Sequence, residues 1–131
     1  MIYLSELLGR EILDAQGRSV GQLSDLILPG GSATVGAIAV RTTARGVILL
    51  PWSAIAERKG KTIVLSLAAG NWTLYISQKG DLWLARDVRD KEVVDTTRAK
   101  LARVNSILLE ESPLVPQQGW QVIGVDVGNR G

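Results

Sequence analysis

The amino-acid sequence predicts an all-β fold of short strands, in which helix is confined to brief turns. Apolar runs of strand length are separated by turn residues along the chain, and the loop Pro29–Ser32 is the clearest separator, a pattern typical of β structure. Within Thr62–Leu67, the residues Ile63, Leu65 and Leu67 alternate with Thr, Val and Ser, which is the period of a half-buried strand. Hydrophobic residues make up 46% of the chain, enough to form a packed core around these strands.

The first elements are a helical turn and two strands. Tyr3–Leu8 places its leucines on one side of a single turn, and Ser5 is the expected N-terminal cap. We expect a short strand at Glu11–Leu13 and a longer one at Ser19–Leu28, bent near Gly21. The segment between them begins with Asp and ends with Gly. It is predicted to be a turn, because Asp can bond its own downstream backbone and Gly accepts a positive φ.

Four further strands are expected after the glycine-rich loop. They lie at Thr34–Arg41, Val47–Leu50, Thr62–Leu67 and Trp72–Ile76. The polar stretch Ser77–Asp81 is the only plausible domain boundary in the sequence. We therefore expect a first unit at residues 1–80 and a second at residues 81–131.

The second unit repeats the pattern of the first. Glu11–Asp14 resembles Glu92–Asp95, and Ala37–Val40 resembles Val122–Val125 after a slightly longer loop. Any two β-hairpins share some apolar alternation, but here a turn, a long strand and a return strand keep one order and spacing. We therefore expect two tandem repeats. Further matches at the spacing that relates Asp14 to Asp95 are Leu4 with Ala85, Leu7 with Val88, and Leu26–Leu28 with Ile107–Leu109.

The second repeat is incomplete. It lacks counterparts of Val47–Trp52 and Thr62–Leu67, and a strand without neighbours exposes unpaired backbone groups. The first repeat, a second chain or further sequence can cover such an edge. We expect a homodimer whose contact lies on the second repeat, around Val104–Leu109 and Val122–Val127.

Histidine and cysteine are both absent from the chain. Without Cys, the chain has no disulfide, thiolate nucleophile or Cys-ligated zinc. Without His, the usual general base and the commonest metal ligand are missing. We therefore expect a non-catalytic protein with no cofactor. The formal net charge of +2 is only weak support for a nucleic-acid partner.

The sequence contains no recognisable targeting or membrane-spanning segment. Met1–Arg10 lacks the basic start, the apolar run and the cleavage site of a signal peptide. No stretch approaches the roughly 18 uninterrupted apolar residues of a membrane span. We expect a soluble, cytoplasmic protein that acts at most at the cytoplasmic face of a membrane, without inserting into it.

Carboxylates are the remaining candidates for metal binding, because Mg²⁺ prefers oxygen ligands. The candidates are Asp14, Asp25, Asp95 and Asp126. Asp14 and Asp95 begin equivalent turns, where an Asp side chain normally bonds the backbone, so we expect structural roles for both. No metal ligand is predicted.

Two other features suggest chemistry but are better explained by structure. Glu11 and Glu92 are equivalent in the two repeats and could form a two-carboxylate site. Each stands beside a basic residue in a short strand that we expect to be exposed, so charge pairing on the surface is the better interpretation. The loop Gly30–Ser32 lacks the Lys-Ser/Thr sequel of a phosphate-binding loop. No catalytic residue is predicted.

Aromatic and basic residues gather near the boundary between the repeats. The four candidate partner-binding residues are Trp72, Tyr75, Trp83 and Arg86. Our preferred interpretation is that the aromatic side chains fill the joint between the repeats. A protein-binding surface is the second, because Trp, Tyr and Arg favour interfaces. Base stacking on a nucleic acid is the third.

The stretch Leu4–Leu26 resembles the opening of PRC-barrel domains. It carries a hydrophobic turn, a Gly, a strand, an Asp-x-x-Gly turn and a Val-Gly pair, and Pro51–Ile55 resembles a later segment of the family. The resemblance implies a small β-barrel. PRC-barrel domains occur in the photosynthetic reaction-centre H subunit, in RimM ribosomal-RNA maturation factors and in many small proteins.

The tandem arrangement narrows this resemblance. The chain is most similar to the N-terminal region of some MgtE-type magnesium-transporter proteins, and the segments that carry this similarity are Leu84–Val88 and Val122–Gly128. This similarity implies an adaptor or regulatory module with a protein partner, or with further domains of a larger chain. The alternative is an RNA-processing or ribosome-assembly adaptor. A carboxylate-based hydrolase is a third and weaker possibility.

Overall fold

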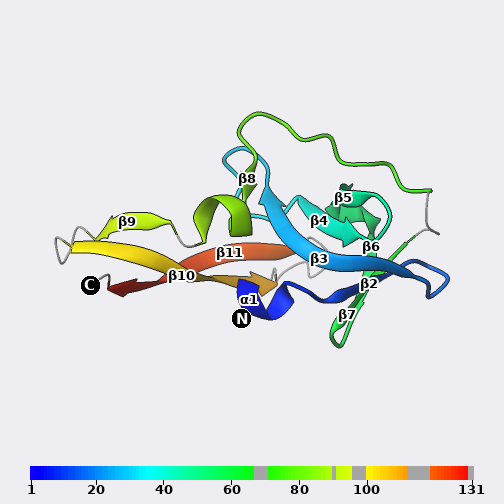
Figure 1. The fold of residues 1–131 in the computed structure, drawn as a ribbon, viewed down its shortest axis with the longest axis horizontal. Helices are drawn as coiled ribbons and strands as arrows, with labels where there is room; N and C mark the ends of the chain where they lie inside the picture. Colours follow the sequence, from blue (N-terminus) through cyan, green and yellow to red (C-terminus); the bar gives the residue numbers. More distant parts are fainter. Residues whose placement is uncertain (67–70, 90, 96–99, 112–118, 130–131) are drawn as a thin grey trace.

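The computed structural model describes residues 1–66, 71–89, 91–95, 100–111 and 119–129, and the strands in these residues form two sheets. One sheet has seven strands and the other has four (Figure 1). Helix in the described residues is limited to three short turns: α1 (Leu4–Leu7), η1 (Trp52–Ala54) and η2 (Leu84–Val88). The prediction of a mostly β fold with brief helical turns is confirmed.

The seven-stranded sheet contains most of residues 11–65. Its strands in spatial order are β5 (Gly46–Pro51), β4 (Ala37–Thr42), β3 (Ser19–Leu28), β2 (Glu11–Leu13), β7 (Thr62–Leu65) and β6 (Ile55–Lys59). The strand β8 (Leu82–Trp83) also pairs with β3. Neighbours are antiparallel except β2 and β7, which are parallel. Within the described residues the end strands β5 and β6 do not pair with each other, so the sheet is open and the expected closed barrel is not observed.

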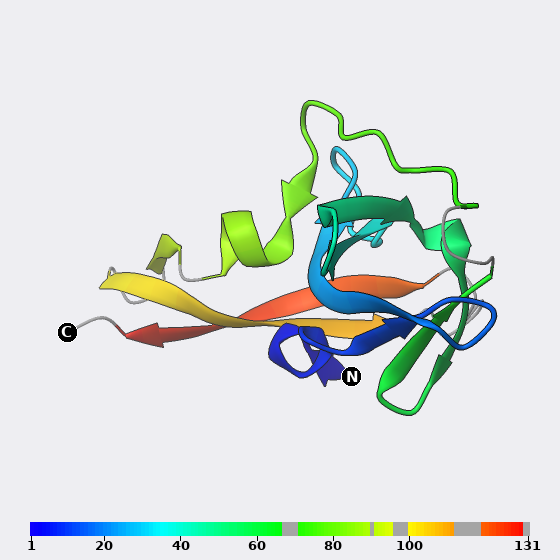
Figure 2. The same ribbon diagram turned by 45° about the vertical axis from the view of Figure 1, so that its right-hand side comes forward.

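The four-stranded sheet is built around a long hairpin. Its strands are β10 (Lys100–Glu111) and β11 (Trp120–Asn129), flanked by β1 (Ile2–Tyr3) and β9 (Glu92–Asp95). β10 is central, because β11 pairs with one of its edges and both β9 and β1 pair with the other. Figure 2 shows this hairpin running past the curled larger sheet and extending beyond it.

The two sheets exchange short strands. β1 precedes the first sheet in the chain but pairs with β10, with Ile2 opposite Leu109. β8 precedes the second sheet but pairs with β3, with Trp83 opposite Ile27. Each half of the chain therefore contributes a strand to the sheet of the other half.

A single hydrophobic cluster spans both halves. Its buried members share exposures below one tenth and come from α1, both sheets and η2; they include Leu4, Leu7, Leu26, Ile38, Leu50, Ile63, Leu84, Val104, Ile107 and Trp120. Ile63 and Leu65 are both fully buried, as the alternation in β7 predicts, whereas Leu67 lies outside the described residues. Removing this apolar surface from water is the main favourable term in joining the halves.

Local chemistry explains the Asp14 turn and the close approach of β3 to β4 at Gly21. The Asp14 carboxylate accepts hydrogen bonds from the N–H groups of Gln16 and Arg18, at 2.8 and 2.9 Å, which confirms its structural turn role. At Gly21 a Cβ atom would overlap the carbonyl oxygen of Arg41, so only Gly allows β3 and β4 to approach this closely.

Three local expectations are wrong. Ser5 does not cap α1: the cap residue is Tyr3, whose N–H donates to the Glu6 carboxylate, and this carboxylate closes the first turn from within the helix. β4 begins at Ala37 and not at residue 34. Residues 72–76 form no strand; they lie beside β5, where the N–H of Tyr75 donates to the Leu49 carbonyl at 2.9 Å.

Candidate functional site

The connector, which we define as residues 71–83, carries exposed apolar side chains beside the larger sheet. It runs from the β5 side of the larger sheet to β8 (green in Figure 1). Leu74, Ile76 and Leu82 are 55%, 78% and 39% exposed. Exposed large apolar side chains mark an interaction site when they form a continuous patch.

Tyr75 fixes the path of the connector. Its N–H bonds the Leu49 carbonyl, and its hydroxyl donates to the Asp81 carboxylate at 3.0 Å. Burial and this hydrogen bond both raise the pKa of the Tyr75 hydroxyl. Tyr75 is half-buried, whereas its neighbours Leu74 and Ile76 are exposed, so the segment presents these two apolar side chains to solvent.

Trp83 and Arg86 form a stacked pair at the end of the connector. The Arg86 guanidinium lies 4.4 Å from the centre of the Trp83 ring, a cation–π arrangement. Asp87 holds both residues: it accepts from the Trp83 N–H at 2.8 Å and from Arg86 Nε at 2.8 Å. The ion pair with Arg86 holds the pKa of Asp87 below its usual range. Of the four candidate residues, these two are brought into contact.

Asp25 joins η2 to the larger sheet. Its buried carboxylate accepts hydrogen bonds from the N–H groups of Leu26, Ala85 and Arg86, at 2.8, 2.7 and 3.0 Å. Burial nevertheless raises its pKa, because desolvation outweighs these bonds. The carboxylate considered as a metal ligand is therefore already used to position Arg86 beside Trp83.

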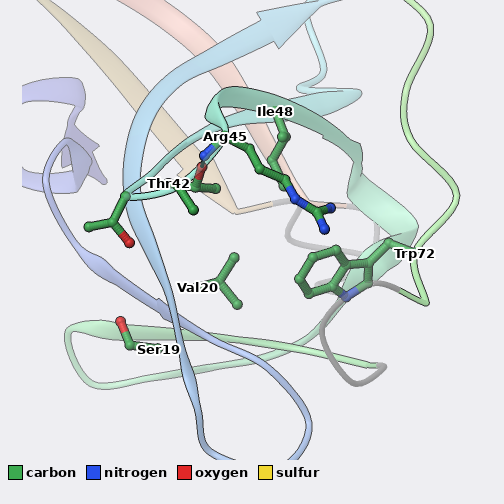
Figure 3. Close-up of a pocket in the computed structure, with 8 residues that line it drawn as sticks. Ser19, Val20, Thr42, Arg45, Ile48 and Trp72 are labelled. Atoms are coloured by element: carbon green, nitrogen blue, oxygen red, sulfur yellow. Dashed lines mark hydrogen bonds between the residues drawn. The ribbon is translucent and has the colours of Figure 1, made fainter.

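Trp72 lies apart from Trp83 and lines a pocket on the first half of the chain. The pocket has a volume of about 300 Å³, and Figure 3 shows Val20, Ile48 and the Arg45 side chain around it. The buried indole Nε1 of Trp72 has no hydrogen-bond partner among the described residues. Of the residues expected to fill the joint, Trp83 lies there through the pairing of β8 with β3. Trp72 and Tyr75 lie against the first half of the chain instead.

Comparison with protein families identifies the first half of the chain. The model of the PRC-barrel domain matches residues 1–79, which is more than half of the chain. The chain belongs to the PRC-barrel domain family. A search of the curated proteins found no match. The PRC-barrel match ends inside the connector, so β8, η2 and the long hairpin lie outside it.

A cluster that the sequence analysis did not detect holds the PRC-barrel domain against the long hairpin. The rings of Trp52 and Trp120 meet edge to face, with centres 5.2 Å apart. The Arg58 guanidinium lies 5.4 and 5.3 Å from these centres and pairs with the Glu111 carboxylate. At Gly119 a Cβ atom would lie 2.5 Å from the Trp52 ring. Trp52 and Arg58 are far in the sequence from Glu111 and Trp120, so no local pattern indicates this contact.

Two negative findings apply to the described part of the PRC-barrel protein. No three acidic side chains there lie close enough together to hold a metal ion. None of its helices has the length and apolar character needed to cross a membrane.

Proposed function

We propose that this PRC-barrel protein is a non-catalytic adaptor or regulatory module that binds a protein partner through the connector. The observation that supports this most directly is the exposure of Leu74, Ile76 and Leu82 on a segment whose path is fixed by Tyr75. We call these three residues, together with Trp83 and Arg86, the connector surface.

Its chemistry fits protein recognition. Aliphatic side chains supply apolar area, and a Trp stacked with an Arg resembles the anchors that dominate many protein interfaces. The hydrogen bonds of Tyr75 and Asp87 order this surface before a partner binds. A preordered surface loses less conformational entropy on binding.

The proposed context is a membrane-transporter assembly of the magnesium-transporter type, at the cytoplasmic face of the membrane. The support is the resemblance of Leu84–Val88 and Val122–Gly128 to the N-terminal region of MgtE-type proteins. The partner is then another protein of that assembly or a further domain of a larger chain.

We also propose that residues 81–131 form a second, divergent copy of the PRC-type unit. Backbone hydrogen bonds at equivalent positions support this: the N–H of Leu23 donates to Arg10, and the N–H of Val104 donates to Lys91. The short strands β1 and β8 also occupy equivalent places: β1 pairs with the long strand β10 of the second unit, and β8 pairs with the long strand β3 of the first.

One inserted residue adjusts the alignment of the two copies. The turn α1 closes with Leu8 donating to Leu4, whereas η2 closes with Arg89 donating to Leu84, one residue further. π turns accommodate one extra residue in this way. Leu84 therefore corresponds to Leu4, and both are buried, so Leu84 replaces Ala85 as the match of Leu4.

Photo-crosslinking in the native host tests the adaptor function. A photoreactive amino acid at Ile76, 78% exposed, should give one dominant adduct, and mass spectrometry should identify a membrane-transport protein. The matched control is the same amino acid at Val47, an apolar residue of β5 that is 46% exposed. Equal crosslinking at the two positions would contradict a binding role for the connector.

The alternative function is an RNA-associated adaptor, and the stacked Trp83–Arg86 pair favours it. The Arg86 side chain is 60% exposed, and Arg and Trp both stack on unpaired bases. If this alternative holds, a photoreactive amino acid at Ile76 would crosslink to a ribosomal or RNA-processing protein. Single-stranded RNA would bind the protein, and this binding would weaken steeply with salt and with Arg86→Ala.

A further inference from the structure

The outer edge of β11 is covered only at its start. The carbonyl of Trp120 accepts from Val35, and the N–H of Val122 donates to Ala33, both at 2.8 Å. Beyond this point, no strand in the described part of the chain pairs with the outer edge of residues 123–129. Exposed strand edges offer unpaired N–H and C=O groups to another strand.

The uncovered part of β11 also leaves part of the core open to solvent. Val125 is directly opposite Ile107 in the ladder, so the two side chains share one face of the sheet. Ile107 is fully buried, whereas Val125 is 47% exposed. Ile123 is also 47% exposed. An additional strand beside β11 would cover Val125 and extend the apolar face.

The larger sheet shows such a strand at the corresponding place. The return strand β4 is paired along its outer edge by β5, from Ala37 opposite Pro51 to Thr42 opposite Gly46. β11 is the return strand of the smaller sheet, and among the described strands it has no counterpart of β5.

We propose that a second copy of this chain supplies that strand, with the two β11 strands antiparallel and Val125 opposite its own equivalent. The contact is a two-fold, isologous interface. It is separate from the connector surface and does not depend on the proposed adaptor function.

The sequence of the free edge favours this register. With Val125 on the two-fold axis, Ile123 faces Val127 of the second copy and Asp126 faces Gly124, so no like charges oppose each other. A shift that centres the pair on Asp126 would place two carboxylates directly opposite, which is unfavourable. A shift that centres it on Gly124 would move Val122, whose N–H is already bonded to Ala33, one position closer to the two-fold axis.

The register restricts the expected contact to one strand. β10 is bordered by β11 on one edge and by β9 and β1 on the other. The segment Val104–Leu109 therefore supports the interface from within the sheet, and residues 123–127 of β11 form it.

Single cysteines test the register without background, because the natural chain has none. Under mild oxidation Val125→Cys should form a disulfide-linked dimer, because directly opposite Cβ atoms lie within about 5.5 Å of each other. Ile123→Cys alone should not crosslink, but a mixture of Ile123→Cys with Val127→Cys should. Val47→Cys, on the exposed edge strand β5, is the matched control and should remain monomeric.

A charge swap checks the same contact without a covalent bond. Light scattering at tens of micromolar should show a dimer of the natural chain. Val125→Lys and Val125→Asp should each weaken association more than tenfold, because each places like charges at the two-fold axis, and mixing the two should restore it. Val125 is half exposed, so both variants should fold.

Three results would overturn the proposal. One is a monomeric natural chain whose amides at residues 123–127 are nevertheless protected from exchange, which would show that the chain covers its own edge. Another is equal crosslinking of the cysteines at positions 125, 123 and 47. The third is a dimer that the charge changes at Val125 leave intact.

Discussion

Two carboxylates are buried in the described part of the chain, and backbone donors use both. Asp14 bonds N–H groups of its own turn, whereas Asp25 bonds N–H groups of η2, far along the chain. An ionised Asp25 gains these bonds but loses its hydration, and the loss is larger, so its pKa is raised. The joint between β3 and η2 therefore depends on pH.

Asp25→Asn tests this dependence. Because the folded pKa lies above the unfolded value of about 3.9, the native state binds the proton more tightly. The stabilisation by protonated Asp25 is thus fully present below a pH of about 4 and is lost as the pH rises through the raised pKa. The free energy of unfolding of the natural protein, minus that of Asp25→Asn, should decrease as the pH rises through this range. Urea titrations at several pH values measure the difference.

Taking the difference between the natural protein and Asp25→Asn also controls for the other titrating groups. Asp87 has a lowered pKa and therefore contributes the opposite dependence, but it is present in both proteins and largely cancels. A difference in unfolding free energy that stays constant with pH would show that the three N–H donors balance desolvation at Asp25, and one that increases with pH would show that they outweigh it.

Among the elements, η1 and β6 contact the start of β11 through Trp52, Arg58 and Trp120. Trp120 is 3% exposed and meets Trp52 edge to face. Such aromatic pairs contribute about 0.5–1.5 kcal/mol beyond the area that they bury. The contact thus couples the stability of the PRC-barrel domain to the placement of the long hairpin.

A double-mutant cycle measures this coupling. We expect Trp52→Leu and Trp120→Leu to show an interaction energy of about 0.5–1.5 kcal/mol in chemical denaturation. As a control, Trp83→Leu combined with Trp120→Leu should be additive within about 0.5 kcal/mol, because no ring contact links Trp83 with Trp120 in the described residues. Additive effects for Trp52 and Trp120 would contradict the coupling.

Elements defined by local patterns could be predicted from the sequence, and those defined by distant partners could not. β3, β7 and the Asp14 turn follow from alternation and turn chemistry. β1 and β8 are each only a pair of residues, too short to show a period, and their partner strands lie in the other half of the chain. For the same reason the sequence did not reveal the Trp52–Trp120 contact.

The candidate site was predictable to a similar degree. Trp83 and Arg86 are close in sequence and meet in the structure. Trp72 was grouped with them by sequence distance alone, but it packs in a pocket with Val20 and Ile48. The exposed positions Leu74 and Ile76 were missed, because the side chains that face outward are set by the hydrogen bonds of Tyr75 to Leu49 and Asp81, which the sequence does not reveal.

At the scale of the whole molecule, strand exchange explains why the connector is exposed. The chain must cross from β5 to β3 to deliver β8, and the connector makes this crossing over the surface of the larger sheet (Figure 1). The same exchange places β1 and α1 against β10. The position of the connector surface therefore depends on the packing of the two halves of the chain against each other.

Calorimetry of the full chain and of residues 1–79 tests this interlocking most directly. Residues 1–79 alone would expose Leu4 and Leu7, which are fully buried in the full chain, and would leave β1 without a partner strand. We predict one cooperative unfolding transition for the full chain and no cooperative transition for residues 1–79 under the same conditions. A fragment 1–79 that unfolds cooperatively at the temperature of the full chain would show that the PRC-barrel domain is independent of the long hairpin, and would contradict the account.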